Sequence, residues 1–399
     1  MVSDVCVVGG GLVGLAVAWQ LKRAQPALRL TLLEKEGGVA CHQSSHNSGV
    51  LHAGLYYAPG SSKAQLAVSG LREMVRFCRE HGIAHDQCGK IVVATHEDEH
   101  PRLENLFRRG TANGLHGLRM LSSSEIAEFE PHAVGTAAIH VPEEGIVDYP
   151  AVAARLAVLI EESGGNVHLN AGVDRLVRTG GRWVVESRAG AFEAHFVVTC
   201  AGLHSDRLVR AAGQRATAQI VPFRGEYFRL RNTRQHLVRN LIYPVPDPKF
   251  PFLGVHFTRL IGGGIEAGPN AVLAFAREGY RWRDCNPRDL AEVALFPGLW
   301  RFLAKYPSMW SYEVWRSFSK KEFARSLQRM VPEIQESDLE PGGAGVRAQA
   351  MTNEGKLVED FHFEQDHGIL HVVNAPSPAA TASLAIGEAI AARVIPQLS

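Results

Sequence analysis

The chain has 399 residues, of which 46% are apolar and 21% are charged, so it can bury a large core, and disorder or collagen-like repeats are excluded. Its 42 basic residues are balanced by 41 acidic ones, for a net charge of +1, which argues against a nucleic-acid partner. The 39 glycines indicate many tight turns or close backbone approaches.

The six cysteines show no Cys-x-x-Cys pair and no zinc-ligand spacing. In a chain of this length they are typical of reduced, mostly buried thiols of an intracellular protein. A strand expected from about Asp4 leaves no room for a signal peptide. No run of about 18 apolar residues is present, so we expect no membrane span. We therefore expect a cytoplasmic protein without a metal site.

The first elements of the chain predict a strand, a helix and a second strand. Residues 4–8 are a β-branched apolar run, typical of a buried parallel strand. Residues 15–21 carry apolar side chains at helical spacing, and residues 29–33 have the composition of a further strand. A glycine-rich turn separates the first strand from the helix, so the order is βαβ.

That turn matches the dinucleotide-binding pattern G-x-G-x-x-G. Gly9 permits a tight turn, Gly11 lets a pyrophosphate approach the backbone, and Gly14 lets the helix lie close to the strand. Glu34 follows Gly14 by 20 residues, at the end of the second strand, where it can accept hydrogen bonds from ribose hydroxyls. The helix N-terminus offers N–H groups to the phosphates. We therefore predict a bound dinucleotide.

Later elements alternate without an internal repeat. A triple glycine between residues 253–260 and 265–267 predicts a hairpin, and residues 243–246 predict a stiff turn. Helices are expected at residues 63–81, 97–130, 151–162 and 287–330, and a closing helix is expected to end at about residue 394. Strands are expected at residues 166–170, 173–177, 183–187, 192–199, 225–230, 344–350 and 369–373. The fold class is thus α/β plus α+β, with a Rossmann-like FAD-binding domain (1–82, 146–218 and 341–399) interwoven with an antiparallel-sheet substrate domain (83–145 and 219–340).

Two of these later segments favour FAD over NAD. Residues 197–202 form an apolar strand that ends in small residues, as if the backbone passed close to a nucleotide. Residues 374–381 form a rigid, proline-containing turn that leads into a helix, and such a helix start can stabilise the anion that forms on a reduced flavin. The alternatives are an ordinary sheet strand and a capped C-terminal helix.

Motifs along nearly the whole chain point to one family; they lie at residues 8–14, 46–57, 224–227, 254–258, 268–271, 345–349 and 374–381. With them, the sequence resembles the FAD-dependent L-2-hydroxyglutarate dehydrogenases and oxidases, within the D-amino-acid-oxidase-like flavoenzymes. The resemblance implies oxidation of L-2-hydroxyglutarate to 2-oxoglutarate by hydride transfer from Cα to flavin N5, with electrons passed on to a quinone-type acceptor or O2. Eukaryotic members carry a targeting extension that is missing here, so we expect a bacterial origin.

A dicarboxylate substrate needs fixed positive charge and a proton acceptor. Arg347 lies mid-strand in an apolar sequence with Gln349 on the same face, and the resemblance implies that this arginine binds a substrate carboxylate; an internal salt bridge is the alternative. His256, with Thr258 on the same strand face, is the first candidate for the base that takes the hydroxyl proton, and His52 is its rival. Tyr243 is expected to donate to a carboxylate or cover the pocket, with simple packing as the alternative.

The expected FAD contacts come from the glycine turn, the second strand end, the Ser/His-rich loop and the two later segments. They are Gly9, Gly11, Leu12, Val13, Gly14, Glu34, Lys35, Ser44, Ser45, Asn47, Ser48, Val173, Ala201, Gly202, Asn374, Ser377 and Pro378. A covalent flavin link through a cysteine is the alternative to non-covalent binding.

Residues 295–330 are rich in Trp and Phe and contain Lys320 and Lys321. Packed helices of the substrate domain are the first interpretation, and a peripheral contact with the cytoplasmic face of the inner membrane, which would bring the enzyme to quinone, is the second. Two other functions stay open: an FAD-dependent amine or amino-acid oxidase of the sarcosine- or glycine-oxidase type, and a flavin-binding protein without turnover. The oligomeric state is not predicted.

Overall fold

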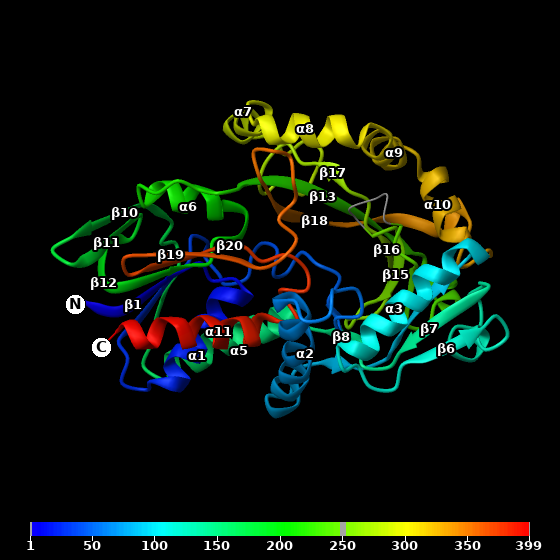
Figure 1. Cartoon of the computed structure of the whole chain (residues 1–399), viewed down its shortest axis with the longest axis horizontal. Helices are drawn as coiled ribbons and strands as arrows, with labels where there is room; N and C mark the ends of the chain where they lie inside the picture. The colour runs from blue at the N-terminus through cyan, green and yellow to red at the C-terminus, as the bar shows by residue number, and fades with distance from the viewer. Residues whose placement is uncertain (1, 248–252, 399) are drawn as a thin grey trace.

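The computed structural model describes residues 2–247 and 253–398, which form two large sheets with helices packed on them (Figure 1). β1 (Ser3–Val8), α1 (Leu12–Ala24) and β2 (Leu30–Leu33) are the predicted βαβ unit. β1 lies between β2 and β12 (Gly190–Thr199) and is parallel to both. This unit is the centre of the first sheet.

The first sheet has the order β10-β11-β12-β1-β2-β9, and β20 pairs with the C-terminal end of β12 and with β19. These strands are β9 (Asn166–His168), β10 (Val173–Thr179), β11 (Arg182–Ser187), β19 (His362–Asp366) and β20 (Ile369–Asn374). The chain thus leaves this sheet and returns to it twice, and the ends of β1, β2, β12 and β20 meet at one edge.

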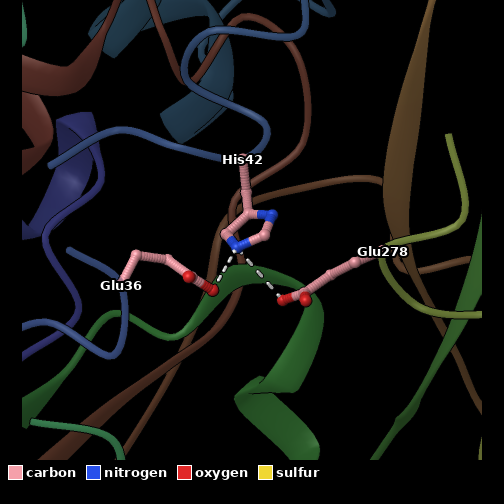
Figure 2. Close-up of side chains that lie close together, drawn as sticks. All are labelled: Glu36, His42 and Glu278. Atoms are coloured by element: carbon pink, nitrogen blue, oxygen red, sulfur yellow. Dashed lines mark hydrogen bonds and ion pairs between the residues drawn. The ribbon is translucent and has the colours of Figure 1, made fainter. Parts of the chain in front are cut away.

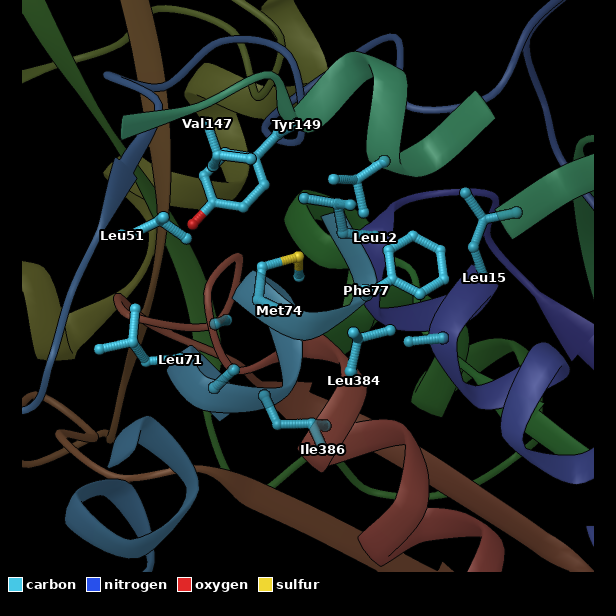
Figure 3. Packing of buried hydrophobic residues seen from close by; sticks show 14 of the residues in the cluster. Leu12, Leu15, Leu51, Leu71, Met74, Phe77, Val147, Tyr149, Leu384 and Ile386 are labelled. Carbon is cyan, nitrogen blue, oxygen red and sulfur yellow. The ribbon is translucent and has the colours of Figure 1, made fainter. Parts of the chain in front are cut away.

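One face of this sheet is covered by α1, α2 (Ser62–Glu80), α5 (Tyr149–Glu162) and α11 (Ser383–Val394), whereas α6 (Ser205–Ala211) lies on the other face (Figure 1). Leu12 and Leu15 of α1 meet Met74 and Phe77 of α2 and Leu384 of α11 in a common core (Figure 3). Burying each such side chain contributes ~1.5–3 kcal/mol, so the helices that are far apart in sequence are fixed against one another.

The second sheet has the order β17-β13-β16-β15-β14-β5-β7-β6, with β18 paired along β13. Only β14 and β5 pair in parallel; β15 and β16 form the predicted hairpin. The strands are β5 (Lys90–Ala94), β6 (Arg119–Ser122), β7 (Ala137–Val141), β13 (Gln219–Leu230), β14 (Leu241–Pro244), β15 (His256–Arg259), β16 (Ile265–Gly268), β17 (Val272–Leu273) and β18 (Leu339–Met351).

Helices pack on both faces of this sheet (Figure 1), and a small third sheet is present as well. The helices are α3 (His100–Ala112), α4 (Ile126–Phe129), α7 (Pro287–Ala294), α8 (Pro297–Lys305), α9 (Pro307–Phe318) and α10 (Lys320–Gln328), and the third sheet holds β3 (Val50–Leu51), β4 (His85–Asp86) and β8 (Gly145–Val147). Short 3-10 turns lie at Glu97–Glu99, Gly202–His204, Asn232–Leu237, Glu336–Asp338 and Ile395–Gln397. No helix of the described residues is both long and apolar enough to span a bilayer.

Two local predictions are wrong. The stretch 97–130 is not continuously helical, because β6 lies within it and pairs with β7; only Leu121 of β6 is buried, so this edge strand has no apolar alternation to reveal it. Tyr243 and Pro244 are not a turn but the end of β14, where Pro244 lies next to Val93 of β5. The predicted α/β plus α+β class is confirmed by the two sheets. The domain limits stay a prediction. β18 lies almost wholly in the range assigned to the FAD-binding domain, although it pairs with β13 of the second sheet.

Candidate active site

The turn between β1 and α1 lies directly against the end of β12. Gly9 has a φ of +112°, and a Cβ there would lie 2.3 Å from the carbonyl oxygen of Cys200. A Cβ on Gly14 would lie 2.0 Å from the carbonyl oxygen of Gly9. Any other residue would push α1 or the turn away, so both glycines serve the close packing that the motif predicts.

A cavity of about 1360 Å³ opens at this turn. Gly9 and Gly11, residues 200–204 after β12 and residues 375–381 before α11 all line it. Ligand pockets usually measure ~300–1,000 Å³, so this one has room for a dinucleotide and a small second molecule. The three distant segments expected to surround one nucleotide therefore do border one space.

Polar groups are fixed at the β2 side of the cavity. Glu34 is buried, and its carboxylate accepts hydrogen bonds from the N–H groups of Gly10 at 2.6 Å and Glu36 at 2.9 Å. The hydroxyl of Ser44 accepts from the N–H of Leu12 at 3.0 Å, at the start of α1. The carboxylate keeps further lone pairs for ribose hydroxyls, and the helix start favours phosphate.

A charged cluster, Lys35, Glu36, His42, His204 and Glu278, lies at the same side of the cavity. His42 Nε2 lies 2.9 Å from Glu36 Oε1 and 3.3 Å from Glu278 Oε1 (Figure 2). Partial burial alone would raise the pKa of Glu278, but hydrogen bonds from His204 and Lys35 lower it to about 2. Although Glu36, His42 and Glu278 have metal-ligand spacing, the Lys35 ammonium, 2.7 Å from Glu278 Oε1, already supplies the positive charge.

At the other end of the cavity, two aromatic rings are stacked. Tyr243 of β14 lies on His256 of β15 with ring centroids 3.8 Å apart, and His256 Nδ1 is 2.9 Å from the carbonyl oxygen of Gly254. Burial lowers the pKa of His256 to about 3, and the nearby His52, Arg347 and Lys90 act in the same direction, although the bond to Gly254 opposes it. His256 is therefore a neutral imidazole that donates from Nδ1.

His52 follows β3 and is tied to the C-terminal turn. Its backbone N–H donates to the hydroxyl of Thr381 at 3.1 Å. The hydroxyl of Tyr149 bonds to the same Thr381 hydroxyl at 2.7 Å and donates to the carbonyl of Val50 at 3.0 Å. The segment of His52 and the turn at residues 375–381 are thus held together at the cavity wall.

Arg347 and Gln349 share one face of β18, as the alternation predicted, and both line the cavity. Tyr227 of the neighbouring β13 lines it as well. Burial lowers the pKa of Arg347, and Tyr227 and Glu313 act in the opposite direction. Glu313 itself is bonded to Arg316 through both carboxylate oxygens, at 2.6 and 2.7 Å.

Most predicted site residues border this one cavity; they are Gly9, Gly11, Leu12, Val13, Glu34, Lys35, Ser44, Asn47, Ser48, His52, Val173, Ala201, Gly202, Tyr243, His256, Arg347, Gln349, Ser377 and Pro378. Four other predicted site residues do not line the cavity. Gly14 packs α1 on the turn, Ser45 donates its hydroxyl to Ala40 at 2.6 Å, Thr258 is hydrogen-bonded to Tyr243 from behind, and Asn374 donates to the carbonyls of Val358 and Asp360. These residues support the site.

Several residues at the site were not predicted. Tyr56, Tyr57 and Lys63 line the cavity, and Lys90 and Glu144 form an ion pair behind it. Lys90 was detectable, because a lysine that opens a run of buried apolar residues needs a partner. Glu144 lies in a short turn between two strands, and nothing in its local sequence distinguishes it from a surface residue.

Comparison with known proteins identifies the family. The model of the family described as FAD dependent oxidoreductase matches residues 4–393. The chain belongs to this family. It is 48% identical to an L-2-hydroxyglutarate dehydrogenase of Indibacter alkaliphilus over 96% of either chain, and 44% identical to that of Escherichia coli K12 over 98% of this chain and 93% of the other. These relatives confirm the resemblance drawn from the motifs.

A solved structure shows the same fold. The L-alpha-glycerophosphate oxidase of Mycoplasma pneumoniae, with FAD bound, superposes with a TM-score of 0.80 at 22% identity, over 99% of this chain and 95% of the other. FAD fits the cavity described here: the turn at Gly9 and Gly14 has no space for side chains, the α1 N-terminus faces the same space, and Glu34 is fixed for a ribose. The chain is an FAD-dependent oxidoreductase.

Proposed function

We propose that this flavoenzyme oxidises L-2-hydroxyglutarate to 2-oxoglutarate. The names of its relatives at 44–48% identity support this substrate. The observation that carries the proposal is the far end of the cavity, where the cation of Arg347 and the imidazoles of His52 and His256 face one space beside the flavin segments. A substrate with a carboxylate next to a secondary alcohol needs that combination of groups.

Each group has a separate task in this oxidation. When bound, FAD would supply the two-electron acceptor for the hydride that leaves the substrate Cα. Arg347 holds the substrate carboxylate through a bidentate fork, and an imidazole takes the hydroxyl proton as the carbonyl forms. Tyr243 and Tyr227 form part of the wall at this end of the cavity.

Electrons then leave to a quinone-type acceptor or to O2, and we propose that a membrane is the place of transfer. Three side chains of α8 and α9 are strongly exposed: Trp300 at 58%, Trp315 at 62% and Phe318 at 69%. Lys320 and Lys321 follow directly. Aromatic side chains next to basic ones suit the headgroup layer of an anionic bilayer, on the cytoplasmic side.

The experiment is anaerobic reduction of the purified yellow protein. L-2-hydroxyglutarate should bleach the flavin absorbance, and D-2-hydroxyglutarate should leave it unchanged. Bleaching by sarcosine, glycine or L-amino acids instead would identify an amine oxidase, and no bleaching by any acid or amine would leave a flavin-binding protein without turnover.

The membrane contact is tested by co-sedimentation with anionic vesicles, measured at low and at high salt. The unaltered protein should sediment with the vesicles, and the double variant Trp315→Ser with Phe318→Ser should not.

A further inference from the structure

A buried ion pair lies behind His52 and has no task in the chemistry described so far. Lys90 Nζ, from β5, lies 2.5 Å from Glu144 Oε2, in the turn between β7 and β8, and both side chains are fully buried. Removing two charges from water costs several kcal/mol for each ion, and such pairs are often no better for stability than packed apolar residues. A pair of this kind directly behind a cavity wall therefore points to function.

The carboxylate of this pair reaches the segment that carries His52. Glu144 Oε1 accepts the backbone N–H of Ala53 at 3.2 Å, and Glu144 Oε2 lies 3.7 Å from His52 Nδ1. This second distance is in ion-pair range and longer than a hydrogen bond, and bonds of this kind commonly shorten when a substrate binds. With Nδ1 towards Glu144, the ring has Nε2 left for the substrate.

Lys90 keeps this carboxylate ionised. Burial alone would raise the pKa of Glu144, but Lys90 and His52 lower it to about 2. The Lys90 ammonium also lies over the rings of Tyr56 and Tyr243, 4.6 and 4.7 Å from their centroids. A negative charge therefore persists beside His52 at neutral pH, although no solvent reaches it.

The second imidazole has different neighbours. His256 donates to a backbone carbonyl, and the cations of Arg347 and Lys90 both act to lower its pKa. The group that takes the hydroxyl proton becomes positively charged. This charge is stabilised beside Glu144 and destabilised among cations, so the surroundings distinguish the two histidines.

We infer that Glu144 is a positioning residue that orients His52 through Nδ1 and thereby makes His52, and not His256, the proton acceptor, with Lys90 holding Glu144 in place. This inference rests on the proposed oxidation. In that step the hydroxyl proton passes to His52 Nε2, the O–H electron pair becomes the second bond of the carbonyl, and the Cα–H pair leaves as hydride to FAD. The proton returns to solvent after the product has left.

Other titratable side chains share the space around His52. Tyr56, Tyr57, Tyr227, Tyr243, His256 and Arg347 line the cavity with it, and Glu144 and Lys90 lie behind it. Burial raises the pKa of each of these four tyrosines, so none of them carries charge at neutral pH. Glu144 is the anion of this set.

The test is the pH profile of single-turnover flavin reduction by L-2-hydroxyglutarate in the FAD-loaded enzyme. Glu144→Gln with Lys90→Met removes both charges and keeps the volume, so no buried ion is left unpaired. We expect the limiting reduction rate to fall ~10–100-fold, by analogy with the loss of a residue that orients a metal-binding histidine. The acidic limb of the profile should move to lower pH, because the imidazolium loses its anionic neighbour, and substrate affinity should stay the same.

Glu130→Gln is the matched control, because Glu130 is also a buried carboxylate that accepts two backbone N–H groups, from Arg239 and Asn240, and does not line the cavity. An unchanged rate and profile in the double variant would overturn the inference. A slower rate with an unshifted acidic limb would overturn it as well, because that result indicates a structural role.

Nitrogen-15 NMR of the histidines in the unaltered holoenzyme tests the inference independently of any variant. A proton on Nδ1 of His52 supports it, and a proton on Nε2 of the neutral ring overturns it. If L-2-hydroxyglutarate fails to reduce the unaltered enzyme, the proposed function fails, and the NMR result still decides the tautomer.

Discussion

The two ends of the cavity are built in different ways. At the nucleotide end the turn at Gly9, the start of α1 and the strand end at Cys200 meet through close backbone contacts, and polar side chains surround them. At the substrate end the wall is made of side chains from separate strands, such as Tyr243, His256 and Arg347. Substitutions at the first end should therefore affect folding and FAD binding, and substitutions at the second should affect chemistry in a folded holoenzyme.

Gly9→Ala should have the largest effect. Its Cβ would overlap the Cys200 carbonyl at 2.3 Å, and a φ of +112° is strained for alanine as well. We expect protein without bound flavin and with a lower Tm, measured by absorbance and thermal unfolding. Gly164→Ala separates the two causes, because Gly164 also has a positive φ, of +77°, but nothing lies within 4 Å of its Cβ position. That control should lose only ~1 kcal/mol and keep its FAD; flavin loss in both would show that the overlap is irrelevant.

At the substrate end, His52→Gln should reduce the rate of flavin reduction more than His256→Gln. Loss of a general base typically costs ~10²–10⁴-fold, whereas a neutral imidazole that donates to Gly254 mainly shapes the pocket. Stopped-flow reduction with saturating L-2-hydroxyglutarate compares the two variants, and the flavin spectrum shows that both keep their cofactor. A greater loss of rate in His256→Gln would return the role of base to His256.

Arg347→Lys should act on binding and leave the flavin in place. Lysine keeps the charge but loses the bidentate fork, so the Kd for L-2-hydroxyglutarate should rise ~10-fold while the limiting reduction rate changes little. Arg231→Lys, at an exposed pair with Glu340, is the control and should change neither. Saturation behaviour in Arg347→Lys equal to that of the unaltered enzyme would remove this residue from the substrate site.

The same contrast explains what the sequence could predict. The βαβ unit and the roles of Gly9 and Gly14 depend on neighbours in the chain, so a local motif was enough to find them. The partners of Thr258 and Asn374 depend on which strands meet in space, and both residues turned out to lie behind the wall. Glu144 was missed for the same reason: its partners Lys90 and His52 lie on other segments, and its local sequence gives no sign of burial. A resemblance to a family located the cavity, but not the contacts that distinguish one histidine from another.

The smallest expected effect lies at the nucleotide end, in the cluster around Glu278. The pKa of this carboxyl is lowered to about 2 by His204 and Lys35 against the effect of burial, so its contribution to stability is present above the ordinary glutamate range, near pH 4.5, and is lost as the pH falls towards 2. Because the cluster is partly exposed, Glu278→Gln should cost only ~1 kcal/mol at pH 7. Denaturant unfolding of the two proteins from pH 7 to pH 3 should show this difference shrinking in the acid range, while Glu162→Gln, at an exposed pair with Arg155, changes little at any pH. A constant difference across that range would mean that Glu278 acts through packing and not through its charge.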